Sequence, residues 1–270
     1  VDSAYFCVIN NSINLLNYQK HMKKQFWYFI FLLFYIGTLP VQGKITLPAI
    51  LSDNMVLQQK AQVRFWGKAR PGEKVTVSTS WDKNIYTVQT PTDGHWEVKI
   101  KTPGVMDNQT LTVKGENTIT IHNILIGEVW LCTGQSNMEF PVARDPNVKW
   151  KTGILNETEE MKDADYPSIR LFHVEHQLAP EGEKEDCIGR WLVCTPENVK
   201  EFSAVGFIFG RKLYKELQMP VGLIQSTWGG THAESWTERR VMKDNPLYAD
   251  VMEEFAPQNV KREKDKCKVP

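Results

Sequence analysis

The chain has 270 residues, of which 41% are hydrophobic and 24% are charged. This balance is typical of a globular protein with a substantial core, and the length fits one large or two modest domains. Lysine plus arginine equals aspartate plus glutamate at 32 each, so no excess of positive charge indicates a nucleic-acid partner.

The first 43 residues predict export. Met22-Lys23-Lys24 gives a positive start, the apolar run 26–41 follows, and Val41-Gln42-Gly43 stands at the expected cleavage point. The apolar run is shorter than the ~20 residues of a membrane-spanning helix, so we expect a cleaved signal peptide (22–43) and no stable membrane insertion. Residues 1–21 do not resemble the start of a signal peptide and are interpreted as an upstream extension. The expected location is periplasmic or secreted.

Residues 44–122 have the pattern of an antiparallel β-sandwich domain. Short runs alternate apolar and polar residues and are rich in valine, threonine, isoleucine and tryptophan. Turn signals with glycine or proline separate the runs, which are residues 61–69, 74–81, 84–90, 95–102 and 109–115. Strands at this spacing favour a small sandwich. Residues 90–100 are predicted to form a hairpin in which Asp93-Gly94 supplies the positive φ angles.

Residues 123–270 are predicted to form an α/β domain with a parallel sheet flanked by helices. Residues 167–174 read as a strand, and 202–217 have apolar positions at a helical period. Four charged residues are expected on the outer face of that helix: Arg211, Lys212, Lys215 and Glu216. Residues 221–225 read as a buried strand, and strand, helix, strand implies a parallel crossover.

Two strands of this domain end in turns that contain glycine. The run ending at Cys132 leads into Thr-Gly-Gln-Ser-Asn, which contains Ser136, and residues 221–226 lead into Thr-Trp-Gly-Gly-Thr. If the strands are parallel neighbours, both turns open on the same edge of the sheet, where α/β proteins bind ligands. Ser136 would then begin a helix as a nucleophile, and the N–H groups of Gly229 and Gly230 would face an oxyanion.

The same residues have a plainer interpretation that the pattern leaves open. A serine after a strand is often a helix cap, and Gly-Gly is often only a turn. The nucleophile turn of α/β-hydrolases has the pattern G-x-S-x-G, and the segment Gly134-Gln135-Ser136-Asn137-Met138 lacks the final glycine.

The segment Gly127–Val142, GEVWLCTGQSNMEFPV, resembles the nucleophile block of the SGNH (GDSL-like) hydrolases, and within them the sialate O-acetylesterase family. The similarity continues through 169–174, 191–196 and 202–213 to PVGLIQSTWGGTHAESW, which ends at Trp236. It implies an incomplete SGNH-like domain behind a β-sandwich, in an exported esterase that needs no metal or organic cofactor. The implied partner is an O-acetylated carbohydrate.

The resemblance also implies the roles of site residues. Ser136 is the expected nucleophile, and its own N–H and that of Gly229 or Gly230 are the expected oxyanion donors. Asn137, His232 and Glu234 are candidates for the substrate pocket. His232 is also considered as the base, since a serine nucleophile needs one within hydrogen-bond reach.

The family's base and its orienting carboxylate come from an Asp-x-x-His block, which residues 1–270 do not contain. We therefore interpret the chain as C-terminally incomplete, with its base expected beyond Pro270. Alone it is expected to be weakly active or inactive, because loss of the base leaves only oxyanion and binding effects. An incomplete sheet is also expected to expose an edge and apolar surface.

Metal and disulfide patterns are weak. His173 and His176 at a strand end do not have the spacing of a zinc site on a helix. Cys187 and Cys194 are the nearest cysteine pair after the signal, so a disulfide between them is possible in an exported protein, although C-x6-C fits no usual zinc pattern.

Two other functions stay open at this point. One is an acetylxylan-type esterase with the same chemistry on another sugar, because the residues that choose the acceptor cannot be identified from the pattern. The other is a carbohydrate-binding protein without catalysis, for which the nine tryptophans are the relevant feature. The sequence does not predict an oligomeric state.

Overall fold

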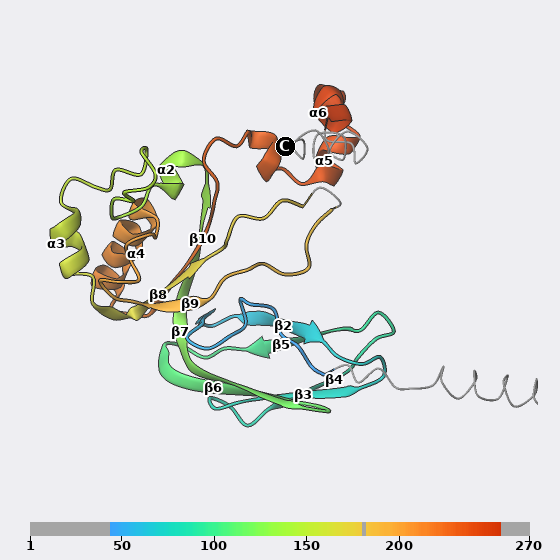
Figure 1. Cartoon of the computed structure of the whole chain (residues 1–270). Helices are drawn as coiled ribbons and strands as arrows, with labels where there is room; N and C mark the ends of the chain where they lie inside the picture. The colour runs from blue at the N-terminus through green and yellow to red at the C-terminus, as the bar shows by residue number, and fades with distance from the viewer. Residues whose placement is uncertain (1–43, 180–181, 255–270) are drawn as a thin grey trace, which may run out of the picture. The chain divides into compact units, whose positions relative to one another are not determined.

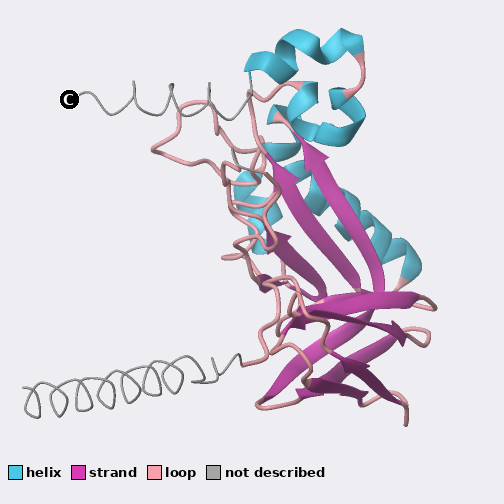
Figure 2. Cartoon of the chain, turned by 90° about the vertical axis from the view of Figure 1, so that its right-hand side faces the viewer, coloured by secondary structure: helices cyan, strands magenta, loops and turns pink. Residues whose placement is uncertain are grey.

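The computed structural model describes residues 44–179 and 182–254, which belong to one compact unit. The predicted upstream extension and signal peptide lie outside the described residues. Among the helices that are described, none is long and apolar enough to cross a membrane. Figures 1 and 2 show antiparallel strands packed in one region and strands flanked by helices in the next.

The first region is the predicted β-sandwich. Strands β2 (Gln62–Lys68) and β5 (His95–Lys101) pair antiparallel as one small sheet. The second sheet has the order β4-β3-β6-β7 in this region. Its strands are β3 (Lys74–Thr79), β4 (Ile85–Gln89), β6 (Met106–Lys114) and β7 (Thr118–Gly134). Every second residue points inward, so Phe65, Trp96 and Ile100 are fully buried against Val75 and Val77.

The predicted hairpin at residues 90–100 is wrong. β4 pairs with β3 and β5 pairs with β2, so the turn before β5 carries the chain from one sheet to the other. The turn itself is present, because Gly94 N–H donates to Pro91 O at 3.1 Å, but only Gly94 has a positive φ. Turn chemistry alone does not reveal which of the two sheets β5 joins.

Strand β7 connects the two regions. It runs for 17 residues, from the sandwich into the second region (Figure 1). Its first half pairs antiparallel with β6, and its second half pairs parallel with β10 (Val221–Thr227). The short β1 (Val56–Gln58) adds a parallel partner at residues 125–127. The predicted boundary between residues 122 and 123 therefore falls inside one continuous strand.

The second region contains the predicted parallel sheet. β10 lies between β7 and β8 (Tyr166–His173) and is parallel to both. Helix α4 (Ala204–Leu217) makes the crossover into β10 and packs against it. The antiparallel edge strand β9 (Trp191–Cys194) was not predicted. Three helices lie beside these strands in Figure 1: α2 (Ser136–Glu139), α3 (Glu157–Lys162) and α4. The described chain ends with η1 (Ala233–Trp236), α5 (Arg239–Lys243), η2 (Pro246–Tyr248) and α6 (Ala249–Glu254).

Helix α4 forms as its sequence predicts, with one exception on its outer face. Ser203 is the N-cap and accepts from Gly206 N–H at 3.0 Å, and Gln218 ends the helix in the left-handed conformation. Lys212, Lys215 and Glu216 are exposed as expected. Arg211 is not, because its side chain is only 17% exposed and pairs with Glu160 of α3.

The possible disulfide between Cys187 and Cys194 is not formed. Both are free thiols, as is Cys132, while Cys267 lies outside the described residues. Cys194 is fully buried at the end of β9, its Sγ is 3.6 Å from Ala164 O, and burial raises the pKa of its thiol to about 12. This cysteine therefore packs as a small apolar side chain.

Candidate active site

The two glycine-containing turns meet at the carboxyl ends of neighbouring parallel strands, as the sequence predicts. The β7–β10 register pairs Gly134 with Thr227, and Trp228 N–H extends the ladder by donating to Gly134 O at 3.0 Å. Gln135 Nε2 donates to Thr231 O at 3.1 Å and connects the first turn to the second. Both turns are therefore held in one place by main-chain and side-chain bonds.

Ser136 is exposed and is the first residue of α2. Gln135, not Ser136, is the N-cap, and it makes no side-chain capping bond, so Ser136 does not cap this helix. Gly134 has a φ of 142°, which favours glycine and lets the chain turn sharply from strand to helix. Because α2 is only four residues long, its N-terminus offers oriented N–H groups and not a long-helix dipole.

Gly229 lies directly beside Ser136. A Cβ atom added to Gly229 would be 3.4 Å from Ser136 Oγ and 2.8 Å from Glu139 Oε2. The Gly229 N–H donates to that same Glu139 carboxylate, which is only 6% exposed. The predicted oxyanion donor is thus next to the serine, but in this structure its hydrogen bond goes to a buried carboxylate.

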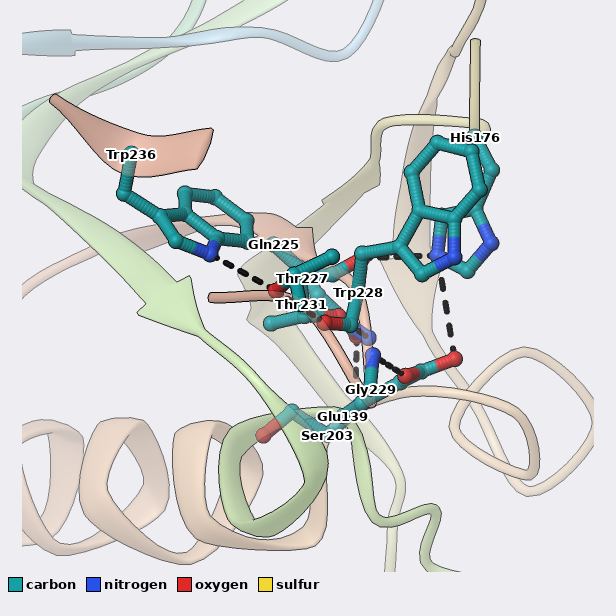
Figure 3. A network of polar contacts seen from close by, with 9 residues as sticks. All are labelled: Glu139, His176, Ser203, Gln225, Thr227, Trp228, Gly229, Thr231 and Trp236. Carbon is teal, nitrogen blue, oxygen red and sulfur yellow. Dashed lines mark hydrogen bonds and ion pairs between the residues drawn. The ribbon is translucent and has the colours of Figure 1, made fainter. Parts of the chain in front are cut away.

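His176 and Trp228 lie next to Glu139 and Gly229 (Figure 3). Together with Ser136, these residues are called the cluster below. His176 Nε2 is 2.7 Å from Thr227 O and 3.7 Å from Glu139 Oε1. Since a carbonyl only accepts, Nε2 carries a proton in this contact. The ring stacks on the indole of Trp228 at 4.2 Å between centroids and 5° between planes. His176 is therefore fixed on three sides.

A series of buried hydrogen bonds holds the carboxyl end of β10 in place. Gln225 is fully buried, accepts from Ser203 N–H at 2.7 Å and donates to Thr227 Oγ1 at 3.0 Å (Figure 3). These bonds connect the N-cap of α4 to the strand that carries the second turn. A fully satisfied buried network of this kind fixes the position of the strand end.

The other predicted site residues lie around the cluster with fewer contacts. Gly230 has a φ of 77° and open space where a Cβ would be. Asn137 and His232 are exposed, and His232 directly precedes η1. Glu234 lines a separate small cavity of about 130 Å³ with Arg239 and Met242. Within residues 44–179 and 182–254, no histidine is hydrogen-bonded to Ser136 Oγ.

Three residues of the cluster were not predicted: Glu139, His176 and Trp228. The sequence offered a signal only for Glu139, which stands three positions after Ser136 and so one helical turn away. His173, at the end of β8, has its pKa lowered, first by burial and then by repulsion from His176. In the part of the chain that the structure describes, no group of three histidine, cysteine or acidic side chains is placed to hold a metal ion.

The sequence from β7 to the C-terminal tail matches a known family. The model of the carbohydrate esterase, sialic acid-specific acetylesterase family matches residues 126–267. The chain belongs to this family. The acetylesterase match begins inside β7 and includes Ser136, Glu139 and Gly229. The resemblance predicted from the sequence is confirmed.

Individual members of the acetylesterase family give the same result. Sialate O-acetylesterase from Pongo abelii is 38% identical over 214 residues, and that from Homo sapiens is 37% identical over the same length. Each alignment covers 72% of this chain and 39% of the relative, so the chain spans about two fifths of their length. A crystal structure of a carbohydrate acetylesterase from Xanthomonas citri superposes with a TM-score of 0.67 at 30% identity, over 75% of this chain and 44% of that one. This chain thus has the predicted fold class, an α/β sheet flanked by helices behind antiparallel strands.

Proposed function

We propose that Ser136 is the nucleophile of an esterase that removes O-acetyl groups from sialic acid or a related sugar. The observation that carries the proposal is the position of Ser136. It is exposed, does not act as a helix cap, and lies beside Gly229 where the carboxyl ends of β7 and β10 meet. Membership of the acetylesterase family and its sialate O-acetylesterase relatives support the substrate class.

The reaction proceeds in two steps. Ser136 Oγ attacks the acetyl carbonyl carbon as a base takes its proton, which gives a tetrahedral oxyanion. The oxyanion collapses, the sugar hydroxyl leaves with a proton, and water then hydrolyses the acetyl-serine. The N–H groups of Ser136, Gly229 and Gly230 are the proposed oxyanion donors, and removal of one such donor typically costs about 3 kcal/mol.

Glu139 decides when Gly229 can take part. Its carboxylate accepts the Gly229 N–H, so that donor becomes free for an oxyanion only when the carboxylate moves away. Gly230 has no such carboxylate acceptor in the described structure and is open to the solvent side. Asn137, His232 and Glu234 remain candidates for contacts with the substrate. The base is proposed to come from an Asp-x-x-His block outside this sequence, with His232 as the local alternative.

A covalent probe and an activity assay test this proposal. The chain is treated with a p-nitrophenyl phosphonate, which transfers its phosphonyl group to an activated serine, and is digested for mass spectrometry. In parallel, hydrolysis of p-nitrophenyl acetate is compared with that of a Ser136→Ala variant. We expect slow labelling at Ser136 and weak hydrolysis that the variant lowers further, because a serine without its base still attacks slowly, whereas the rate due to oxyanion and binding effects does not need it.

Ser78→Ala is the matched control, since Ser78 is an exposed serine on β3 and far from the turns. It should behave as the unaltered chain. Full esterase rates from residues 44–270 alone would contradict the proposed position of the base. Labelling that is equal at several serines, with Ser136→Ala unchanged, would contradict the nucleophile.

The same assays distinguish two alternative functions. An acetylxylan-type esterase differs only in the acceptor and would prefer acetylated xylose chains. A carbohydrate-binding protein without catalysis is favoured by one observation, that no described histidine is hydrogen-bonded to Ser136 Oγ. It predicts sugar binding without any labelling of Ser136.

We also propose that the protein is exported and that the signal peptide 22–43 is removed. The support is the order of charged, apolar and cleavage residues in the sequence. A mature N-terminus at Lys44, read by mass spectrometry after secretion, is the expected result. A chain that begins before Met22 would contradict it.

A further inference from the structure

A pocket of about 470 Å³ lies beside the candidate active site and is not formed by the serine. Its walls come from Pro48, Ile50 and Trp66 on the sandwich side, and on the other side from the segment that follows β8, the end of β10 and η1. Thr227 and Trp228 line it just before Gly229 in the sequence, and Thr231 lines it just after, whereas Gly229 and Ser136 do not. Its volume is within the usual range for small-molecule sites.

Three indoles line this pocket: Trp66, Trp228 and Trp236. Trp66 is 36% exposed and Trp236 is 41% exposed, which is unusual for side chains whose burial would stabilise the fold. They come from β2, from the end of β10 and from η1, so the fold brings Trp66 of the sandwich to two indoles of the second region.

Two of the indoles are held in fixed positions (Figure 3). Trp236 Nε1 donates to Thr231 Oγ1 at 2.8 Å, and Thr231 Oγ1 in turn donates to Trp228 O at 2.7 Å. Trp228 is fixed by its stack on His176. Rings that are already ordered lose little conformational entropy when a ligand binds, which favours a binding role.

Two of the four charged side chains that line the pocket, Glu185 and Asp186, are engaged by other residues. Glu185 pairs with Lys68 and lies 3.4 Å from His95. The Asp186 carboxylate accepts from the N–H groups of Ala49 and Cys187. Apart from Glu175 and Lys184, which carry opposite charges, the remaining lining is mostly aromatic surface with a few hydroxyl and carbonyl groups. This chemistry fits a neutral sugar ring, whose C–H face packs on an indole face and whose hydroxyls need few partners.

We propose that this pocket is a subsite for a neutral pyranose ring of the glycan, next to the sugar that carries the acetyl group. The neighbouring position follows from the pocket ending beside Gly229 without including Ser136. That assignment of position rests on the proposed esterase function, whereas binding of a neutral sugar to Trp66 and Trp236 does not. The pocket thus extends recognition from the ester to the surrounding carbohydrate.

The test is saturation-transfer NMR with methyl β-D-galactopyranoside and methyl β-D-xylopyranoside as probes, on the full chain. We expect transfer to the ring C–H protons, and binding roughly three- to tenfold weaker in Trp66→Ala and Trp236→Ala. Trp66→Phe keeps an aromatic face and should restore most of the signal. Trp150→Ala, which removes an exposed indole outside the pocket, should bind as the unaltered chain does.

The outcomes separate this inference from the proposed function. Sugar binding that depends on Trp66 and Trp236, without phosphonate labelling of Ser136, supports the subsite and overturns the esterase. Labelling of Ser136 with sugar binding absent, or unchanged in both tryptophan variants, overturns the subsite and leaves the esterase. Loss of binding in Trp66→Phe as well as Trp66→Ala, with circular dichroism unchanged, also overturns stacking as its basis.

Discussion

Glu139 is the residue on which the arrangement of the candidate site depends. It is buried, it accepts the N–H of Gly229 from the opposite turn, and its other oxygen faces His176 at 3.7 Å. A buried acceptor that serves a main-chain N–H holds that segment in place, because the N–H would otherwise lose its partner. The residue therefore connects α2 to the turn after β10.

Replacement of Glu139 should destabilise the protein, and the size of the loss should depend on whether the new side chain can still accept the Gly229 N–H. Glu139→Ala leaves that N–H without a partner and is expected to lower the free energy of unfolding by about 1–3 kcal/mol. Glu139→Gln keeps an amide oxygen at the same place and should cost clearly less. Urea unfolding followed by tryptophan fluorescence measures both. Equal losses in the two variants would show that charge, not the hydrogen bond, is what matters.

Among the residues of the candidate site, the sequence predicted Ser136 and Gly229 but not Glu139 or His176. Ser136 and Gly229 could be predicted because each stands in a short turn after an apolar run. Glu139 and His176 could not, because their roles arise from contacts with Gly229 and Thr227, which are 90 and 51 residues away in sequence. The polarity of a residue is visible in a sequence, but the partner that it meets depends on the strand order.

The packing of α4 on β10 depends on glycine at one position of the helix. A Cβ on Gly210 would lie 2.5 Å from Leu223 Cδ1 and within 3.0 Å of two more Leu223 atoms, so the helix rests directly on the strand. Gly206, one turn earlier, has more room, since the nearest atom to its Cβ would be Cys132 Sγ at 3.1 Å. The two glycines thus have the same helix around them but different neighbours.

This difference predicts opposite effects of the same substitution. Alanine gains about 1 kcal/mol of helix propensity over glycine. At Gly210 the overpacking against Leu223 costs roughly 1–3 kcal/mol, so Gly210→Ala should be neutral to destabilising by up to about 2 kcal/mol. At Gly206 the contact is softer, and Gly206→Ala should be neutral or stabilising. Thermal unfolding by circular dichroism ranks the two, and a higher midpoint for Gly210→Ala would contradict the close packing.

Elements with a strong local pattern were predicted well, and elements defined by a partner were not. The period of apolar residues in 202–217 was enough to locate α4, and alternation was enough to locate the strands of the sandwich. The hairpin at 90–100 failed because Trp96 and Ile100 bury the same face whether β5 pairs with β4 or with β2. β9, with four residues, is too short to show a period.

On the scale of the whole molecule, strand β7 joins the two regions that the sequence analysis separated at residue 122. It pairs with β6 on the sandwich side and with β10 on the other. Near the crossing, a Cβ on Gly127 would lie 2.1 Å from Pro220 O, so the start of β10 rests against the β7 main chain. A substitution that displaces β7 at Gly127 should therefore disturb its hydrogen bonds to β6 and to β10.

We therefore expect residues 44–254 to unfold in one cooperative transition. Hydrogen exchange measured by mass spectrometry across a urea series should show peptides from β3 and from α4 losing protection at the same midpoint, because β7 cannot leave one sheet while keeping its order in the other. Gly127→Ala should lower both midpoints together, by an amount equivalent to about 1–3 kcal/mol, since the clash is with main chain. Gly104→Ala, whose Cβ would meet only Lys60 Cε at 3.8 Å, is the control and should change neither. Separate midpoints for β3 and α4, or a loss in Gly127→Ala that is confined to α4, would show that 44–122 and 123–270 fold as independent domains.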